Sequence, residues 1–222
     1  MKIVALLPMK GNSERVPNKN LKDFCGKPLY TKVLETLLKS SFIDKVVVNT
    51  DSSTIKNEIE SNYKDLVIVL DRPEQLVGDF VSMNKIIEYD IKKIKADLYI
   101  QTHSTNPLLK TGTLDSAIQK MFDIQGKYDS IFSVTRIQTR LYNQKGEPFN
   151  HNPKQLLRTQ DLEPLYEENS NFYIFTKQSF VKSGGKRIGA KPFMFEIDKT
   201  EAVDIDEPQD FIIAESLYKL LR

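Results

Sequence analysis

The sequence contains few features of secreted or membrane-spanning proteins. Its 222 residues include a single cysteine, Cys25, so no disulfide can form within the chain. No apolar run approaches the roughly 20 residues that a membrane-spanning helix needs. The chain starts on a short strand-like segment rather than on an apolar signal region. We therefore expect a soluble cytoplasmic protein that does not bind a membrane.

The sequence also lacks an excess of charge of either sign. Lys plus Arg number 32 and Asp plus Glu number 30, for a net charge of +2. This balance gives no general case for nucleic acid as a partner, so any strong charge effect must be local. No internal repeat and no Pro/Gly/Ser-rich linker divides the chain, and its length suffices for one substantial core. We expect a single domain over residues 1–222.

Short runs rich in β-branched residues recur along the first two thirds of the chain, and they are apolar on both faces. Such runs are typical of strands that are buried on both sides of a sheet. They lie at residues 3–7, 46–48, 66–70, 98–100 and 131–134. Between them, apolar residues at spacings of three and four predict helices near 29–37, 83–94 and 114–122. This alternation predicts an α/β fold with a doubly wound, mostly parallel open sheet.

The pattern changes after residue 137. Three prolines and many polar residues interrupt residues 137–169, so we predict that this stretch leaves the sheet as a small protruding arm. Two further strands, at 172–175 and 193–197, flank a short helix near 177–181. Pro28 suits the first turn of a helix, and so does Pro208 in the final helix.

A basic loop follows the first predicted strand. It carries three cations, Lys10, Arg15 and Lys19, and one glycine, Gly11. Open sheets of this kind bind ligands at the carboxyl ends of their strands. Cations and backbone N–H groups at that place can hold a triphosphate, although neither a Walker loop nor a G-x-G-x-x-G turn is present. A solvated loop with scattered cations is the alternative.

The same loop resembles the signature of a known family. Residues 10–21, KGNSERVPNKNL, followed by FCGKPL at 24–29, resemble the acylneuraminate cytidylyltransferase family, the CMP-sialic acid type. Further segments match in order: NTDS at 49–52, RPE at 72–74 with GD at 78–79, RTQDL at 158–162, EENSNFYI at 167–174 and VDIDEP at 203–208. The resemblance thus covers nearly the whole chain.

The resemblance implies a Rossmann-like nucleotidyltransferase. Such an enzyme transfers CMP from CTP to the anomeric hydroxyl of an acidic nonulosonic sugar and releases pyrophosphate, with no covalent enzyme intermediate. The rivals are a cytidylyltransferase for legionaminic, pseudaminic or eight-carbon ulosonic acids, a metal-dependent glycosyltransferase, and a degenerate nucleotide-binding protein without turnover. The arm at 137–169 resembles the part of family members that builds a dimer, so a homodimer is expected.

The resemblance also assigns CTP contacts. The residues implied at the phosphates are Lys10, Gly11, Asn12, Ser13, Arg15 and Lys19, and those implied at cytosine are Asn20, Arg72 and Ser82. Many relatives have arginine in place of Lys10, and lysine keeps the charge but loses the bidentate fork. The alternatives are a helix cap for Asn20 and for Ser82 and a surface cation for Arg72.

Two acids are the candidate metal ligands. Asp204 and Asp206 alternate on an extended segment, so both carboxylates can face one side and share Mg²⁺. Asp206 can alternatively cap the final helix. With Lys10 and Arg15, these acids are the candidate catalytic residues.

The resemblance also implies five candidate sugar contacts. Gln101 begins a polar loop that resembles the sugar-binding loop of the family, and the absence of an acid between Gln101 and Lys110 argues for an unphosphorylated sugar. The other candidates are Arg140, Asn169, Tyr173 and Arg187, although Tyr173 can equally be a core residue. No chemistry is assigned to His103 or His151, because neither has a Cys, Asp or Glu partner at zinc-ligand spacing, or to Cys25, which lacks the sequence context of a catalytic thiol.

Overall fold

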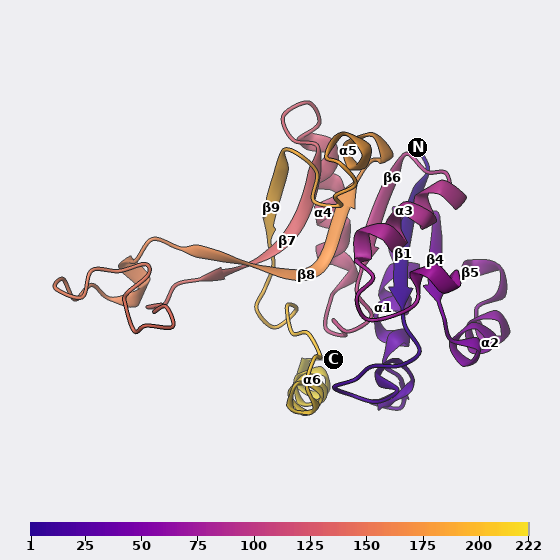
Figure 1. Ribbon diagram of the computed structural model, residues 1–222, viewed down its shortest axis with the longest axis horizontal. Coiled ribbons are helices and arrows are strands. Elements are labelled where there is room, and N and C mark those ends of the chain that lie inside the picture. The colour runs from indigo at the N-terminus through magenta and orange to yellow at the C-terminus, as the bar shows by residue number, and fades with distance from the viewer. Residues whose placement is uncertain (222) are drawn as a thin grey trace.

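The computed structural model describes residues 1–221 and contains a seven-stranded sheet in the order β5-β4-β1-β6-β8-β7-β9 (Figure 1). The strands are β1 (Ile3–Met9), β4 (Lys45–Thr50), β5 (Val67–Asp71), β6 (Leu98–Thr102), β7 (Ser130–Ile137), β8 (Leu165–Phe175) and β9 (Pro192–Glu196). Strand β8 runs antiparallel to its neighbours β6 and β7, whereas the other pairings are parallel. The prediction of a mostly parallel sheet is confirmed.

Helices cover both faces of this sheet. They are α1 (Tyr30–Leu38), α2 (Ser53–Asn62), α3 (Met83–Lys93), α4 (Thr111–Asp123), α5 (Lys177–Lys182) and α6 (Pro208–Leu221). Every residue of β1 is buried, and alternate residues enter two different cores. Ala5 packs in one core with residues of α1, α2 and α4, and Val4 packs in the other with residues of α3 and α5. The fold is therefore doubly wound, as predicted.

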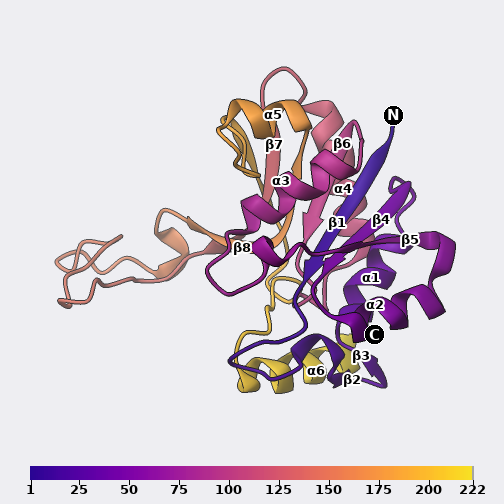
Figure 2. The same cartoon turned by 45° about the vertical axis from the view of Figure 1, so that its right-hand side comes forward.

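A third, smaller core joins the two ends of the chain. The hairpin of β2 (Asp23–Phe24) and β3 (Lys27–Pro28) lies against α6, as Figure 2 shows. Phe24 and Phe211 pack edge to face there, with ring centroids 5.5 Å apart. Pro208 begins α6, but the prediction for Pro28 is wrong, because this residue belongs to β3 and α1 begins at Tyr30. This core places the segment before α6 beside the basic loop.

Helix α2 is missing from the sequence predictions. Only Ile55 and Ile59 of this helix are buried, so its periodic signal is weak. A local cap defines its start instead, because the Ser52 side chain accepts a hydrogen bond from the Ile55 N–H at 3.3 Å. The described chain, residues 1–221, also contains four single-turn 3₁₀ segments: η1 (Lys19–Leu21), η2 (Lys64–Leu66), η3 (Glu74–Leu76) and η4 (Thr159–Asp161). No helix within residues 1–221 is long and apolar enough to cross a membrane.

The segment between β7 and β8, residues 138–164, extends away from the sheet (Figure 1). We call it the arm. Strand β8 begins at Leu165, well before the predicted start at residue 172, and Glu167 pairs with Thr135. Residues 166–168 are exposed, so this part of the strand carries no hydrophobic signal in the sequence. The prediction that irregular chain extends to residue 169 is therefore wrong.

Candidate functional site

A cavity of about 460 Å³ opens at the carboxyl edge of the sheet, where β1 and β6 end. This volume is in the range of small-molecule sites. Many of the predicted residues line it: Lys10, Ser13, Arg15, Lys19, Asn20, Arg72, Asp204 and Asp206. The folded chain therefore brings together the basic loop, the proposed base contact and both acids.

The basic loop is held close to the end of β4. The Gly11 N–H donates to Asp51 Oδ1 at 2.6 Å. A Cβ atom at Gly11 would lie only 2.8 Å from Ser52 Cβ, so a side chain at this position would force the loop away. Gly11 and Asn12 do not line the cavity, but the Asn12 side chain accepts from the Ser13 N–H at 2.9 Å and shapes the turn. These two residues set the course of the loop.

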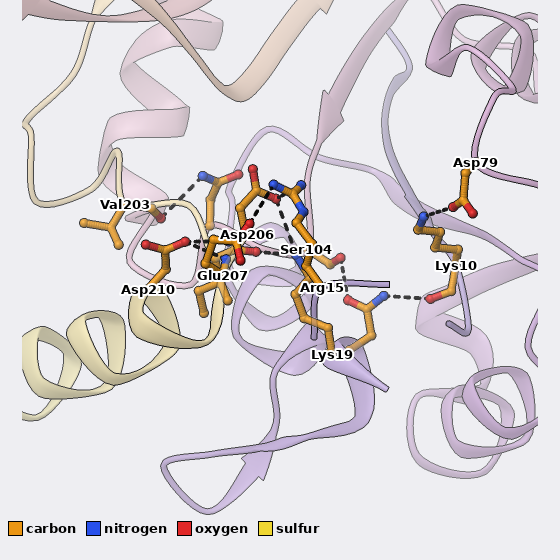
Figure 3. A network of polar contacts seen from close by, with 12 residues as sticks. Lys10, Arg15, Lys19, Asp79, Ser104, Val203, Asp206, Glu207 and Asp210 are labelled. Atoms are coloured by element: carbon orange, nitrogen blue, oxygen red, sulfur yellow. Dashed lines mark hydrogen bonds and ion pairs between the residues drawn. The ribbon is translucent and has the colours of Figure 1, made fainter. Parts of the chain in front are cut away.

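Each cation of the loop already has an acidic partner (Figure 3). Lys10 Nζ contacts Asp79 Oδ1, Arg15 Nη2 lies 2.8 Å from Asp206 Oδ1, and Lys19 Nζ lies 3.5 Å from the same oxygen. The hydrogen bond from Lys10 lowers the pKa of Asp79, and attraction by Asp206 raises the pKa of Arg15. A bound polyanion therefore competes with these acids for the cations.

The acids differ in their surroundings. Burial raises the pKa of Asp204, and a hydrogen bond from Thr105 opposes this rise. Asp204 Oδ1 is buried and has no hydrogen-bond partner within residues 1–221. Asp206 is half-exposed and accepts from Arg15. Asp204 therefore has an unused buried oxygen, whereas Asp206 already has cationic partners.

The start of α6 does not depend on the Asp206 carboxylate. Asp210 Oδ2 accepts from the N–H groups of Asp206 and Glu207, at 3.0 and 2.7 Å. The alternative that the Asp206 side chain caps this helix is therefore wrong. The Asp206 carboxylate is therefore not used for capping, and it lines the cavity.

These two acids fit a cation that shares its ligands with a nucleotide. Within residues 1–221, no group of three or more His, Cys, Asp or Glu side chains could hold a metal by itself. Mg²⁺ is usually bound by one or two carboxylates together with substrate phosphates. The unpartnered Oδ1 of Asp204 is the kind of atom that such an ion would satisfy.

Arg72, which also lines the cavity, is held by a network of hydrogen bonds. Its Nε donates to Asn49 Oδ1 at 2.8 Å, and its Nη2 donates to the carbonyls of Asn49 and Met9 at 2.9 and 3.1 Å. Asn49 Nδ2 in turn donates to Asp90 Oδ1 at 2.6 Å. Burial lowers the pKa of Arg72. Arg72 is therefore a pre-oriented cation and not a mobile surface one.

Asn20 connects two loops around the cavity. Its Nδ2 donates to the Lys10 carbonyl at 2.9 Å, and its Oδ1 accepts from Ser104 Oγ at 2.7 Å. The cap position of η1 is Asn18, so the cap alternative for Asn20 is wrong. Ser82 occupies the cap position of α3, but its side chain makes no capping hydrogen bond and does not line the cavity. We therefore find no contact of Ser82 with the site.

The predicted sugar contacts lie outside the cavity lining of the described chain. Gln101, Tyr173 and Arg187 form a cluster behind one wall, in which the Arg187 Cζ lies 3.7 Å from the Tyr173 ring centroid. Asn169 accepts from Ser133 Oγ at 2.6 Å beside the irregular pairing of β7 and β8. Arg140 belongs to the arm, where it donates to the Leu157 carbonyl.

Six polar or charged lining residues are not among the predicted contacts. They are Glu14, Asp79, His103, Ser104, Thr105 and Ser170. The polar loop after β6 signals that residues 103–105 lie at the carboxyl edge, and Asp79 lies within a matched segment. Ser170 has a positive φ of 56°, a local conformation that the sequence does not reveal. His103, to which the sequence assigns no chemistry, also lines the cavity.

A doubly wound sheet with cations and acids around a cavity at its carboxyl edge defines an α/β protein suited to a phosphorylated ligand. The family model described as cytidylyltransferase matches residues 4–220, so the chain belongs to the cytidylyltransferase family.

Two curated relatives illustrate the match. The pseudaminic acid cytidylyltransferase of Campylobacter jejuni subsp. jejuni serotype O:2 is 29% identical, over 99% of this chain and 97% of the relative. N-acylneuraminate cytidylyltransferase A of Danio rerio is 31% identical, over 96% of this chain and 50% of the relative. The match with the Danio rerio protein therefore spans only about half of that longer chain.

A solved structure shares the fold. The structure of CMP:2-keto-3-deoxy-manno-octonic acid synthetase complexed with CTP superposes with a TM-score of 0.72, at 16% identity, and the match covers 99% of both chains. This similarity confirms the Rossmann-like nucleotidyltransferase fold.

Proposed function

We propose that this protein transfers CMP from CTP to the anomeric hydroxyl of an acidic nonulosonic sugar and releases pyrophosphate. The observation that carries the proposal is the cavity, in which three cations of one loop face two acids of another segment in a chain of the cytidylyltransferase family. The anomeric oxygen of the sugar attacks the α-phosphorus, and the bond from this phosphorus to the bridging oxygen of pyrophosphate breaks.

The residues of the basic loop stabilise the charge of the nucleotide. Lys10 and Arg15 each leave an acidic partner, Asp79 or Asp206, to contact triphosphate oxygens. Arginine and lysine contacts of this kind are strong because donor and acceptor are both charged. Lys19 is buried and donates to the Ile205 carbonyl, so it holds the loop against the acidic segment. Binding of CTP thus exchanges internal ion pairs for contacts with phosphate.

Asp204 and Asp206 would hold Mg²⁺, which would supply positive charge to the pyrophosphate leaving group. The unpartnered buried oxygen of Asp204 supports this assignment. Arg15 and Lys19, which contact Asp206, would keep its carboxylate in place when the nucleotide is absent. Arg72, which lines the cavity, would contact the cytosine.

Pyrophosphate release during incubation with CTP, Mg²⁺ and a panel of acidic sugars tests the activity. The panel should contain N-acylneuraminic, pseudaminic, legionaminic and eight-carbon ulosonic acids, since the related proteins leave this choice open. Release with at least one acid is expected. CTP binding without pyrophosphate release in the presence of any of the acidic sugars would instead identify the non-enzymatic alternative. Transfer of a sugar from a UDP-sugar to an acceptor would identify a glycosyltransferase.

Asp206→Asn tests the metal site. We expect the variant to fold and to lose at least about a hundredfold in kcat, since changes in the surroundings of a metal alone cost 10- to 100-fold. Asp123→Asn, at the exposed end of α4, is the matched control. Wild-type kcat in Asp206→Asn would contradict the assignment of Asp206 to the metal.

We further propose a cytoplasmic homodimer in which the arm reaches the partner. Large apolar side chains of the arm are solvent-exposed, among them Phe149 at 70% and Leu156 at 87%. Burial of such side chains is the usual driving force of stable association. Light scattering should give twice the mass of one chain, and Leu156→Asp should shift the population toward monomer. A fully active monomer at micromolar concentration would contradict the dimer.

A further inference from the structure

Arg187 contacts one wall of the cavity from behind. It lies in the connection between α5 and β9, and its guanidinium stacks on the Tyr173 ring. Its Nη1 donates to Gln101 Oε1 and lies 3.2 Å from His103 Nε2. One Nη1 carries two hydrogens, so it can serve both acceptors. The cluster therefore links a part-buried cation to His103, which lines the cavity.

This contact determines which ring nitrogen of His103 carries the proton. A guanidinium has donors only, so His103 Nε2 must accept with its lone pair, which places the ring proton on Nδ1. Burial and the positive charge of Arg187 lower the pKa of His103 to about 3, so the imidazole stays neutral in the working range of most enzymes. Nδ1 makes no hydrogen bond within residues 1–221 and remains a free donor.

The strand order places His103 on the other side of the basic loop from Arg72. Arg72 follows β5, Lys10 follows β1, His103 follows β6 and Ser170 lies in β8. Because the order is β5-β4-β1-β6-β8, the phosphate-binding loop separates Arg72 from His103. If CTP extends from Arg72 to the loop, the second substrate occupies the side of His103 and Ser170.

We propose that Arg187 is a positioning residue that holds His103 as a neutral, Nδ1-protonated imidazole, and that His103 donates a hydrogen bond to an oxygen of the acidic sugar. This inference rests on the proposed function. A neutral donor recognises a carbonyl or hydroxyl oxygen and adds no further charge beside Arg187. His103 is therefore a specificity residue for the sugar and not for CTP.

Nitrogen-15 NMR tests the tautomer without any turnover. The chain has two histidines, His103 and His151, so His103→Phe assigns both signals by difference. We expect the His103 signals of the wild-type protein to show a neutral ring with the proton on Nδ1 and to stay unchanged as pH falls from about 8 to about 5. In Arg187→Met burial still keeps the ring neutral, but Nε2 loses its donor, so the signals should show a mixture of both neutral tautomers. An Nε2-protonated or charged ring in the wild-type protein would overturn the proposal.

Steady-state kinetics test the donor. His103→Phe should raise the KM for the sugar about threefold to tenfold, as expected for one lost hydrogen bond, and leave the KM for CTP unchanged. His103→Asn, whose amide can reach the place of Nδ1, should restore part of the loss. Arg187→Met should raise the KM for the sugar as His103→Phe does, because the Nδ1 proton is no longer fixed, whereas Lys186→Met, at the exposed neighbouring cation, should not.

The outcomes separate the two proposals. Equal increases in both KM values, or no change in either, would overturn the assignment of His103 to the sugar while turnover itself continues. If the wild-type protein releases no pyrophosphate from CTP with any of the acidic sugars, the proposed function is overturned, and with it the sugar contact of His103. The NMR result would still decide which ring nitrogen of His103 carries the proton.

Discussion

Replacing Asp90 with asparagine tests whether the buried carboxyl group near Arg72 destabilises the folded protein at neutral pH. Asp90 lies on α3 and is 1% exposed. Its Oδ1 accepts from Asn49, and its Oδ2 is buried without a partner in the described chain. Burial raises the pKa of Asp90 from 3.8 to about 7, against the opposing effects of Asn49 and Arg72.

The size and the sign of the effect follow from this pKa. One pKa unit corresponds to about 1.4 kcal/mol, so the rise is worth on the order of 4 kcal/mol. The folded protein keeps the proton of Asp90 to higher pH than the unfolded chain does. The contribution of Asp90 to the free energy of unfolding therefore falls as pH rises from about 4 to about 7, and it is constant above that range. Asparagine resembles the protonated carboxyl group but does not titrate, so the free energy of unfolding of the variant does not contain this decrease.

Urea unfolding at several pH values between about 4 and about 8 measures the effect. The free energy of unfolding of Asp90→Asn minus that of the wild-type protein should increase by a few kcal/mol over this range. Asp65→Asn, at an exposed carboxylate in η2, is the control and should show no comparable change. A difference that does not change with pH would refute the reasoning. A difference that falls as pH rises would show that attraction between Asp90 and Arg72 outweighs burial.

Two further predictions concern the basic loop. Asp79→Asn should tighten CTP binding by less than about tenfold, because it frees Lys10 from an exposed ion pair. This gain in affinity should shrink in high salt, and calorimetric titration with CTP at two salt concentrations measures it. Gly11→Ala should weaken CTP binding, because its Cβ would lie 2.8 Å from Ser52 Cβ, whereas Gly112→Ala, with nothing within 4 Å of its new Cβ, should not. Normal CTP affinity in Gly11→Ala would mean that the loop moves without affecting the site.

Much of the fold can be predicted from the sequence, because its signals are local. Strand β1 is buried on both faces, and its unbroken apolar run shows this directly. The first part of β8 is different. Residues 166–168 pair with β7 while their side chains face solvent, so only backbone hydrogen bonds to a distant strand define them. Helix α2 escaped prediction because Ile55 and Ile59 are its only buried side chains.

The candidate site likewise has a part that could be predicted from the sequence and a part that could not. The basic loop and the acids at 204 and 206 are short segments with a recognisable pattern, and both line the cavity. The positions of Gln101, Tyr173 and Arg187 behind the wall could not be predicted, because their roles depend on which neighbour covers them. The sequence offered His103 no zinc-ligand partner, and it could not reveal the contact with Arg187, which lies 84 positions away.

The sequence by itself determined the buried strands, the helices with strong apolar stripes, the basic loop and the paired acids, because each depends on residues close together in the chain. Only the tertiary structure decided that β8 runs against its neighbours, that Asp79 pairs with Lys10, and that Arg187 holds His103. These features arise from strand order and from burial, and both are properties of contacts between distant segments. The protonation of His103 and Asp90 follows from the same contacts, since burial sets the cost of their charge.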